Sequence, residues 1–488
     1  MLDKILTKYK SLSVPVRAAL WFTACNFLLK GISFLTAPLF TRMLPDQEYG
    51  KLTLYMSYEH IILIFATWEI YLGAYQKGLF KYKENEISYT KSTILLTNVI
   101  TAIVFIFVIL FNKVFVEFTS YSWNVIALLF VYLLVFPAYN CWIVNKRTKF
   151  DYKKSVVATL LFSIFNVITP LIALNFLERT AETKFSFTLI ASIVFCFVFY
   201  FISFKKSFVK QKKEELLAYW KFNLSFSAPL VLHSLSFLVL GQADRIMIGK
   251  MVGNSQAAYY GVAYTVSCAV IIFQNSIYQA LKPLIFRFLE EKRFDEIKMI
   301  TSKLLILVSV LILIFILVVP ELFKLLFPLS YYEAVWCIPP IAAGVFFMFQ
   351  YSLYVNVEEY YEKTSYVALV SIVCGIVNVL LNYYGIKMFG YIACAYTTLI
   401  CYVIFSAGHY IFMKRTLKFN NIKENIVNHR VALLVSFAFI ALTIVVTMIY
   451  EMTIVRYALG VLMAFVCVLN KERILSLFSM AKKGKAVV

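Results

Sequence analysis

Apolar runs of about twenty residues recur along nearly the whole chain, and each is long enough to cross a bilayer as a helix. Of the 488 residues, 61% are hydrophobic and only 15% are charged, whereas a soluble domain is nearer half apolar and a quarter charged. The sequence therefore predicts an all-α integral membrane protein that crosses the bilayer many times. About fourteen transmembrane helices are predicted, at residues 18–42, 52–75, 92–112, 123–144, 156–177, 185–204, 222–248, 257–281, 304–320, 334–356, 365–386, 390–413, 431–450 and 454–470.

The net charge of +21 follows from membrane topology rather than from nucleic-acid binding. If the N-terminus is cytoplasmic, about three quarters of the 47 Lys and Arg residues fall in the inside segments, as the positive-inside rule requires. An even number of spans then predicts that both termini are cytoplasmic. Attraction to anionic lipid headgroups is a second effect of the same charges, and membrane lipids are expected partners.

A basic segment, KKSFVKQKKEELLAYWK, separates six predicted spans from eight. Tyr49-Gly50 opens the second span and Tyr260-Gly261 stands at the start of the eighth, which indicates two similar halves with the same direction through the membrane. The predicted organisation is an N-terminal lobe at 1–204, a basic cytoplasmic linker at 205–221, a C-terminal lobe at 222–413, and a segment at 414–488 with a basic loop, two spans and a cytoplasmic tail.

Motifs for catalysis, phosphate cradling and metal binding are missing from the sequence. The nine cysteines are scattered singly, without CxxC or metal-ligand spacing to histidine, which favours roles as small apolar fillers. The predicted outside loops are short, and PDQE and ERTAE are their acidic clusters. A membrane glycosyltransferase or polymerase would need catalytic carboxylates in larger loops. We therefore predict a transporter with no catalytic residue, no metal and no resident cofactor.

Lys30 is the deepest charge in the first predicted span. It lies 13 residues from Arg17 and 12 from Arg42, so close to 20 Å of helix separates it from either end. An unpaired charge at that depth costs at least about 2.5–3.5 kcal/mol, which calls for a water-filled cavity or a partner. Asn26 shares its polar helix face. Two interpretations stay open, a cavity-lining lysine and a structural ion pair with a glutamate of the second span.

That second span carries Glu59 and Glu69, about 80° apart around the helix, so one half-face could hold both. A buried carboxylate can carry a coupling proton, and the structural alternative is pairing with Lys30.

Polar side chains also follow one face in spans seven and eight. His233 and Asp244 are 11 residues apart, which returns to nearly the same helix face, and Arg245 follows directly. A local salt bridge between Asp244 and Arg245 is the structural alternative. The stripe of span eight suits a hydrated lumen or hydrogen bonding between helices, and Lys282 at its inner end could also snorkel. It comprises Tyr260, Tyr264, Ser267, Ile271, Gln274, Tyr278 and Lys282, widened by Asn275 and Gln279.

An arginine-ended first span, then LPDQEYGKL, then a mid-chain DRIMIGKMVGNSQAAYYGVAYTV form a recognisable set. Together they resemble the polysaccharide-transporter branch of the multidrug/oligosaccharidyl-lipid/polysaccharide exporter (MOP) superfamily, whose best-known members are the O-antigen (Wzx-type) flippases. The resemblance covers essentially the whole chain in length, span count and two-lobe layout.

This resemblance implies two six-helix lobes around a central cleft, plus a C-terminal helix pair, alternating between inward-open and outward-open states. The implied cargo is an undecaprenyl-diphosphate-linked oligosaccharide for O-antigen of lipopolysaccharide, capsule or exopolysaccharide, moved to the outer leaflet of the bacterial inner membrane. Basic side chains in a cleft would offset desolvation of the diphosphate. That role falls to Lys30 and Arg245, with Arg42 at the mouth and Lys282 as a further cation. A polysaccharide polymerase and a chain-length regulator are implied partners.

The remaining site residues follow from the same resemblance. The cleft-lining polar candidates are Asn26, His233, Tyr264, Gln274, Asn275 and Tyr278. A proton or sodium gradient would act through Glu59, Glu69 or Asp244. Two alternatives of the same fold stay open. A drug or cation exporter would favour acidic and aromatic groups in its cleft. A peptidoglycan-precursor (lipid II) flippase shares the cationic cleft and uses its last helix pair to help form a lipid-tail groove.

Overall fold

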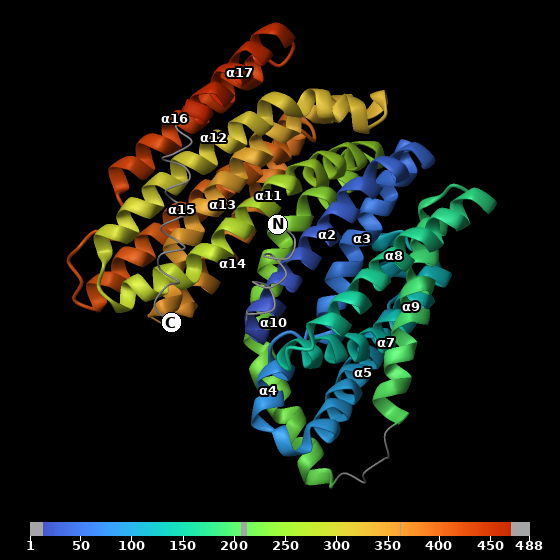
Figure 1. Ribbon diagram of the computed structural model, residues 1–488. Coiled ribbons are helices and arrows are strands. Elements are labelled where there is room, and N and C mark those ends of the chain that lie inside the picture. Colours follow the sequence, from blue (N-terminus) through green and yellow to red (C-terminus); the bar gives the residue numbers. More distant parts are fainter. Residues whose placement is uncertain (1–12, 206–211, 362, 470–488) are drawn as a thin grey trace, which may run out of the picture. The chain divides into compact units, whose positions relative to one another are not determined.

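The computed structural model describes residues 13–205, 212–361 and 363–469, and within these residues the chain is helical throughout (Figure 1). Two compact units divide the chain, Met1–Leu238 and Val239–Val488. The first unit holds α2 (Val14–Met43), α3 (Asp46–Thr67), α4 (Ala74–Lys81), η1 (Lys83–Asn85), α5 (Glu86–Leu110), α6 (Asn112–Thr119), α7 (Trp123–Thr148), α8 (Tyr152–Phe176) and α9 (Ala181–Lys205).

The long helix α10 (Lys213–Met251) contains the boundary between the two units. The second unit continues with α11 (Asn254–Glu290), α12 (Phe294–Leu326), η2 (Leu329–Cys337), α13 (Ile338–Tyr360), α14 (Thr364–Phe389), α15 (Ala393–Phe419), α16 (His429–Met448) and α17 (Thr453–Leu469).

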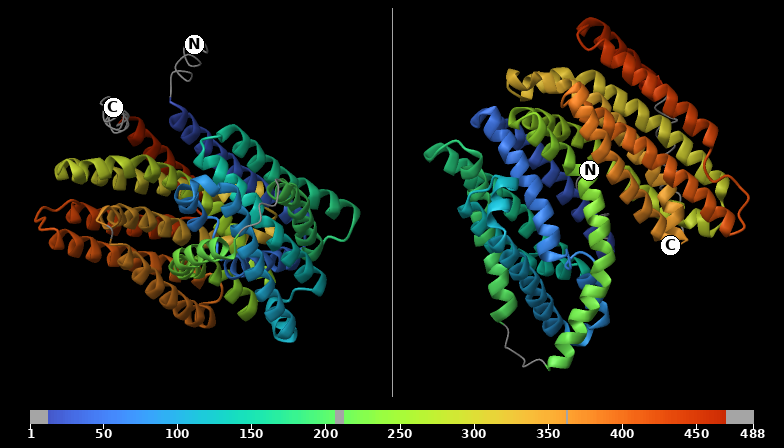
Figure 2. Two further views of the ribbon diagram at one scale, coloured as in Figure 1. Left: turned by 90° about the horizontal axis from the view of Figure 1, so that it is seen from below. Right: turned by 180° about the vertical axis from the view of Figure 1, so that it is seen from behind.

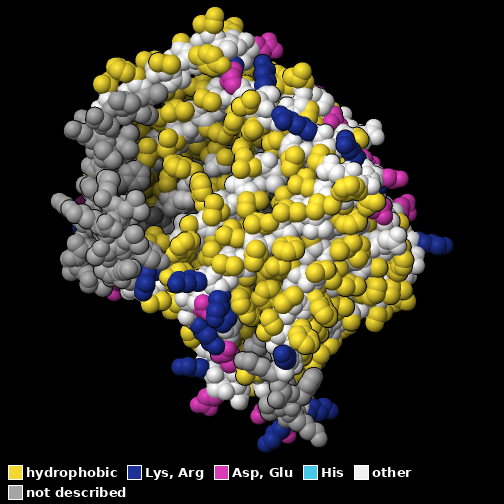
Figure 3. Space-filling view, turned by 45° about the vertical axis from the view of Figure 1, so that its right-hand side comes forward, with side chains coloured by type: hydrophobic (Ala, Val, Ile, Leu, Met, Phe, Trp, Pro, Cys, Tyr) yellow, Lys and Arg dark blue, Asp and Glu magenta, His cyan; other side chains and the backbone are white. Residues whose placement is uncertain are grey.

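Each of the fourteen predicted spans overlaps one of these helices. In the part of the chain that the structure describes, eleven helices are long and apolar enough to cross a membrane, and α3 is not among them. The protein is therefore an all-helical, multi-pass membrane protein. Figure 3 shows hydrophobic side chains over the middle of the visible face, with Lys and Arg mainly toward its edges.

The second predicted span, 52–75, is interrupted. Helix α3 ends at Thr67, and Trp68 and Glu69 both take left-handed backbone conformations, with φ of 49° and 45°. Such values are uncommon for residues other than glycine, Asn and Asp. The Thr67 hydroxyl accepts a hydrogen bond from the Glu69 amide at 3.2 Å, and α4 begins only at Ala74. The sequence of the predicted span 52–75 contains no proline, so it did not indicate that the helix would be interrupted at Trp68 and Glu69.

Aromatic side chains fill the end of the first unit where α4, α5 and α10 meet. The rings of Tyr75 and Tyr89 stack with centroids 5.7 Å apart, and the Tyr89 hydroxyl donates to Asn223 Oδ1 at 2.6 Å. Asn223 is fully buried and also donates to Thr93 Oγ1 at 3.0 Å. The first half of α10 is thereby fixed in the first unit.

In the second unit α13 packs along α15, with α14 and α11 beside them. Helices α16 and α17 lie against α12, as the two views of Figure 2 show. The guanidinium of Arg456, 1% exposed, donates through both terminal nitrogens to Glu321 of α12, at 2.8 and 2.5 Å. The Tyr450 hydroxyl donates to the carbonyl oxygen of Ile316 at 3.0 Å. These bonds attach the last helix pair to the second unit.

Candidate functional site

One enclosed polar centre of the second unit is built around Asp244 of α10. This carboxylate is 1% exposed and accepts three side-chain hydrogen bonds. Tyr260 donates to Oδ2 at 2.5 Å, Thr398 donates to the same oxygen at 2.8 Å, and Asn382 donates to Oδ1 at 2.6 Å. A buried carboxylate usually needs a counter-charge, and these three donors are neutral.

A second layer of oxygen atoms surrounds this centre. Asn382 Nδ2 also donates to Asn378 Oδ1 at 3.1 Å, and the Thr397 hydroxyl donates to Asn382 Oδ1. All of these side chains are buried. Carboxylate, amide and hydroxyl oxygens are the ligands that hard cations prefer. Sequence reasoning missed the contributions of α14 and α15, although two asparagines four residues apart in an apolar span were a usable sign.

Arg245 attracts its neighbour Asp244 electrostatically, but its side chain contacts other residues. One terminal nitrogen of the Arg245 guanidinium donates to Gln242 Oε1 at 2.6 Å, and the guanidinium lies 4.5 Å from the ring centroid of Tyr264. Its Nε is buried without a hydrogen-bond partner. The expected local salt bridge with Asp244 does not form as a direct contact. Lys250, rather than Arg245, takes the last-turn position in α10 that Arg42 takes in α2.

The predicted stripe on α11 is mostly turned into the second unit. Gln274 is 3% exposed and its Oε1 has no partner, whereas Asn275 is exposed. Lys282 contacts Glu359 of α13, with Nζ 2.5 Å from Oε2, and lies 5.9 Å from the ring centroid of Tyr278. The side chain of His233 lies outside the described residues.

Lys30 is exposed on the surface of the first unit. It lies in the middle of α2 and makes no hydrogen bond or ion pair with a described residue. Asn26, on the same helix face, is exposed as well, and so is Arg42 in the last turn. An ion pair between Lys30 and Glu59 or Glu69, the structural alternative, is not formed in this structure.

Glu59 instead interacts with Lys184, a residue that sequence reasoning did not single out. The two side chains attract each other electrostatically without direct contact, and Lys184 is only 9% exposed. The Lys184 ammonium also lies 5.0 Å from the ring centroid of Phe40. Lys184 stands one turn into α9 and directly before the predicted span 185–204, a position where a lysine would be expected at the membrane surface.

Glu69 lies in the break between α3 and α4. Its Oε2 accepts a hydrogen bond from the Ser234 hydroxyl of α10 at 2.7 Å. The three coupling candidates therefore occupy three different environments, and Asp244 is the most completely buried of them.

Two family models match this sequence. The model described as "Polysaccharide biosynthesis protein" matches residues 16–289, more than half of the chain. The chain belongs to the polysaccharide biosynthesis protein family. The MatE family model also matches, over residues 229–384. No curated protein matches its sequence significantly.

Solved structures show the same fold at low sequence identity. A lipid II flippase MurJ in an inward closed conformation is similar with a TM-score of 0.67 at 14% identity, covering 93% of this chain and 99% of that one. An inward-facing multidrug resistance MATE family transporter gives a TM-score of 0.65 at 12% identity, covering 81% of this chain and 96% of the other. A MOP superfamily transporter from Pyrococcus furiosus gives 0.52 at 12% identity, covering 82% and 96%.

Proposed function

We propose that this family member is a flippase that moves undecaprenyl-diphosphate-linked oligosaccharide repeat units, of O-antigen, capsule or exopolysaccharide, from the cytoplasmic to the outer leaflet of the bacterial inner membrane. It would do so by alternating access of a central cleft between two six-helix lobes. The proposed topology has fourteen spans, including a C-terminal helix pair, and both termini are cytoplasmic. A polysaccharide polymerase and a chain-length regulator would act on the delivered units.

The exposed Lys30 carries this proposal. A lysine in the middle of a membrane helix is too far from either end to reach the headgroups, and contact with hydrocarbon would cost at least about 2.5–3.5 kcal/mol. Its exposed side chain therefore favours a water-filled space that admits an anionic group. A diphosphate linked to a lipid has the required charge, and a cationic drug does not.

We also propose that a proton or sodium gradient drives the movement and that Asp244, rather than Glu59 or Glu69, binds the coupling ion. Buried side chains of α11, α14 and α15 donate hydrogen bonds to this carboxylate, and their hydroxyl and amide groups carry oxygen atoms that could bind a cation. Arg245 attracts this carboxylate without direct contact, and its three hydrogen-bond donors are neutral, so a bound cation would supply the counter-charge at the carboxylate itself. Glu59 has a lysine nearby, and Glu69 is half-exposed.

A lipid II flippase is the second candidate, since the MurJ structure covers 93% of this chain. Its cargo is also a diphosphate-linked lipid, so the cationic residues alone do not discriminate between the two.

Complementation separates these functions. The gene is expressed in one strain that lacks its polysaccharide flippase and in another that is depleted of its lipid II flippase. We expect restored surface polysaccharide in the first strain and no rescue of growth in the second. Lys30→Ala and Arg245→Ala at equal expression should lower surface polysaccharide at least tenfold. Rescue of the second strain alone would transfer the assignment to lipid II, and drug resistance without either rescue would indicate an exporter.

A further inference from the structure

A groove lies on the first unit between α7, α8 and α9. Its volume is about 480 Å³. Its apolar wall is formed by Trp142, Val157, Ala158, Leu161, Phe195, Val198 and Phe199. The floor is a packed aromatic layer, in which the Phe199 ring centroid lies 4.8 Å from that of Trp142 and 5.2 Å from that of Tyr139. Val157, Leu161 and Val198 are well exposed, so the groove opens to the bilayer.

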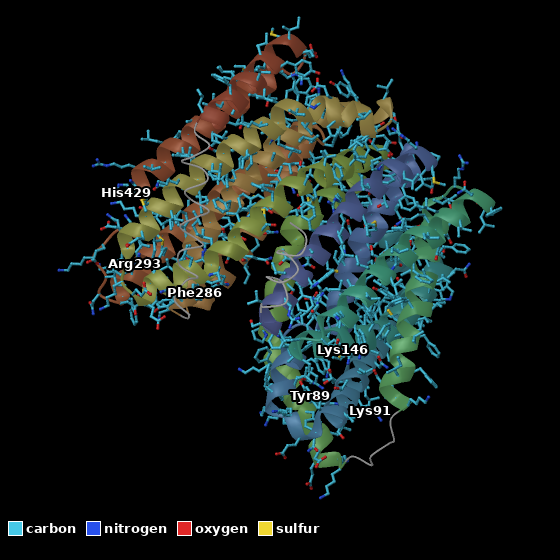
Figure 4. All side chains as sticks on the ribbon, viewed as in Figure 1. Tyr89, Lys91, Lys146, Phe286, Arg293 and His429 are labelled. Carbon is cyan, nitrogen blue, oxygen red and sulfur yellow. The ribbon has the colours of Figure 1, made fainter. Side chains whose placement is uncertain are left out.

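One end of the groove is basic. Lys153 and Lys154 complete its lining in the first turn of α8, and both are exposed. Lys154 Nζ lies 3.5 Å from an Asp151 carboxylate oxygen, and Lys146 Nζ lies 3.4 Å from the same oxygen. Figure 4 labels Lys146 near the end of α7. Lys153 makes no ion pair with a described residue.

Positive charge predominates at this end. Five basic residues stand between positions 146 and 154, and Asp151 is the single acidic residue there. The nearby Glu86 is already engaged, with Oε1 2.6 Å from Lys149 Nζ. The N-terminus of α8, a helix of 25 residues, adds its own partial positive charge. An anionic group at the mouth of the groove would therefore be attracted.

We propose that this groove binds one anionic glycerophospholipid. The phosphate lies against Lys153 and Lys154, and one acyl chain follows the apolar wall. From Lys153 to Leu161 the helix rises about 12 Å, which matches the upper part of an acyl chain. Trp142 is a residue type enriched at the height of the headgroups. The groove is too short to hold a long isoprenoid chain, which distinguishes its occupant from the carrier lipid of the cargo.

The test uses the purified full chain in detergent and counts bound lipid by native mass spectrometry, with phosphatidylglycerol and phosphatidylcholine as probes. We expect phosphatidylglycerol to bind at least tenfold more tightly. Lys153→Ala combined with Lys154→Ala should remove this preference. The matched control is Lys212→Ala combined with Lys213→Ala, because these two lysines are also adjacent, exposed and at the start of a helix. The control should bind like the wild type.

Leu161→Trp fills the groove without changing the charge and should lower phosphatidylglycerol binding by about tenfold. Size-exclusion profiles identify any variant that fails to fold. If the double lysine variant fails, lipid binding is measured on the single variant Lys153→Gln instead. Equal binding of the two lipids, or unchanged binding by both the lysine and the Leu161 variants, would overturn the proposal. Displacement of phosphatidylglycerol by equimolar undecaprenyl phosphate would overturn the glycerophospholipid assignment. None of these outcomes depends on the transported cargo.

Discussion

The hydroxyl of Tyr260 donates to Oδ2 of Asp244 at 2.5 Å, and both side chains are buried. The bond joins the last two turns of α10 to the second turn of α11. It links the aspartate of the mid-chain motif to the tyrosine of its Tyr-Gly pair, so two halves of one sequence motif meet at one carboxylate.

Replacing Asp244 or its donors should separate ion binding from folding. Tyr260→Phe removes one charge-assisted hydrogen bond and should lower stability by about 1.5–3 kcal/mol. Asp244→Asn removes the negative charge and should abolish gradient-driven flipping in liposomes while lipid exchange without a gradient persists. Thermal unfolding and a flipping assay with sodium or pH gradients check both effects. Tyr384→Phe, at an exposed tyrosine of α14, is the control for the loss of a hydroxyl. If flipping by the Asp244→Asn protein still responds to the gradient, the ion site is refuted.

Lys30 should matter for cargo and not for stability. Because Lys30 is exposed and makes no hydrogen bond or ion pair with a described residue, Lys30→Ala should leave the thermal midpoint within about 1 °C. Surface changes are usually worth less than about 0.5 kcal/mol. Flipping should fall at least tenfold, and Lys30→Arg should retain most of it. Lys113→Ala, at an exposed lysine of α6, is the comparison. A large loss of stability in Lys30→Ala would instead indicate a structural partner.

Glu59 and Lys184 should show coupled energetics. Lys184→Met leaves a half-buried carboxylate without its nearby positive charge and should cost less than the roughly 3–5 kcal/mol typical of a broken buried ion pair, because the two side chains are not in direct contact. The double variant Glu59→Gln, Lys184→Met should be more stable than Lys184→Met alone, because no charge is then left unbalanced. Thermal unfolding of the two single variants and the double variant completes a double-mutant cycle. Strictly additive effects would show that the two charges do not interact.

Arg456 should hold the last helix pair in place. Arg456→Ala removes a two-point contact with Glu321 and should cost about 2–3 kcal/mol, less than for a fully buried pair because Glu321 is 31% exposed. Arg456→Lys keeps the charge but not the two-point geometry and should lie between wild type and Arg456→Ala. Limited proteolysis in the connection at 420–428, together with thermal unfolding, measures the loosening. Identical behaviour of the alanine and lysine variants would argue against the two-point contact.

Gly78 and Gly31 form a matched pair of helical glycines. A Cβ at Gly78 would lie 2.0 Å from the Tyr89 hydroxyl oxygen, whereas a Cβ at Gly31 would meet nothing within 4 Å. Gly78→Ala should displace Tyr89, break its bond to Asn223 and lower stability by about 1–3 kcal/mol. Gly31→Ala should raise helix stability by about 0.5–1 kcal/mol. Equal melting temperatures for the two variants would contradict the packing around Tyr89.

Hydropathy and charge placement predicted the helical, multi-pass fold, because a bilayer leaves few other ways to satisfy the backbone. The break at Trp68 and Glu69 was not predictable, since it depends on tertiary contacts of α3, α4 and α10 rather than on a proline. Asp244 was singled out by its position in an apolar span. Its partners Asn382 and Thr398 are more than 130 residues away along the chain, and single-sequence periodicity does not report which helices touch.

For the basic residues, too, the sequence predicted some features of the candidate site and not others. Sequence position identified Lys30 as deep in a span, and the structure leaves it exposed. Lys184 stands near a predicted span end, so nothing in its position indicated that it would be buried beside Glu59. The pairing of Lys282 with Glu359 likewise depends on the packing of α11 against α13.

The exposed lysine in α2 also bears on how the protein is made. The most apolar stretch of this helix has a mean hydropathy of 1.4, against 3.0 for α12, and α3 does not reach the level of a membrane span. A lysine near a helix centre disfavours insertion by about 2.5–3.5 kcal/mol on the translocon scale. Helices α2 and α3 are therefore weak insertion signals. We expect the more hydrophobic helices that follow to assist their insertion into the bilayer during synthesis. The lysine that we propose for an anionic cargo is therefore expected to make insertion of α2 depend on the helices that follow it.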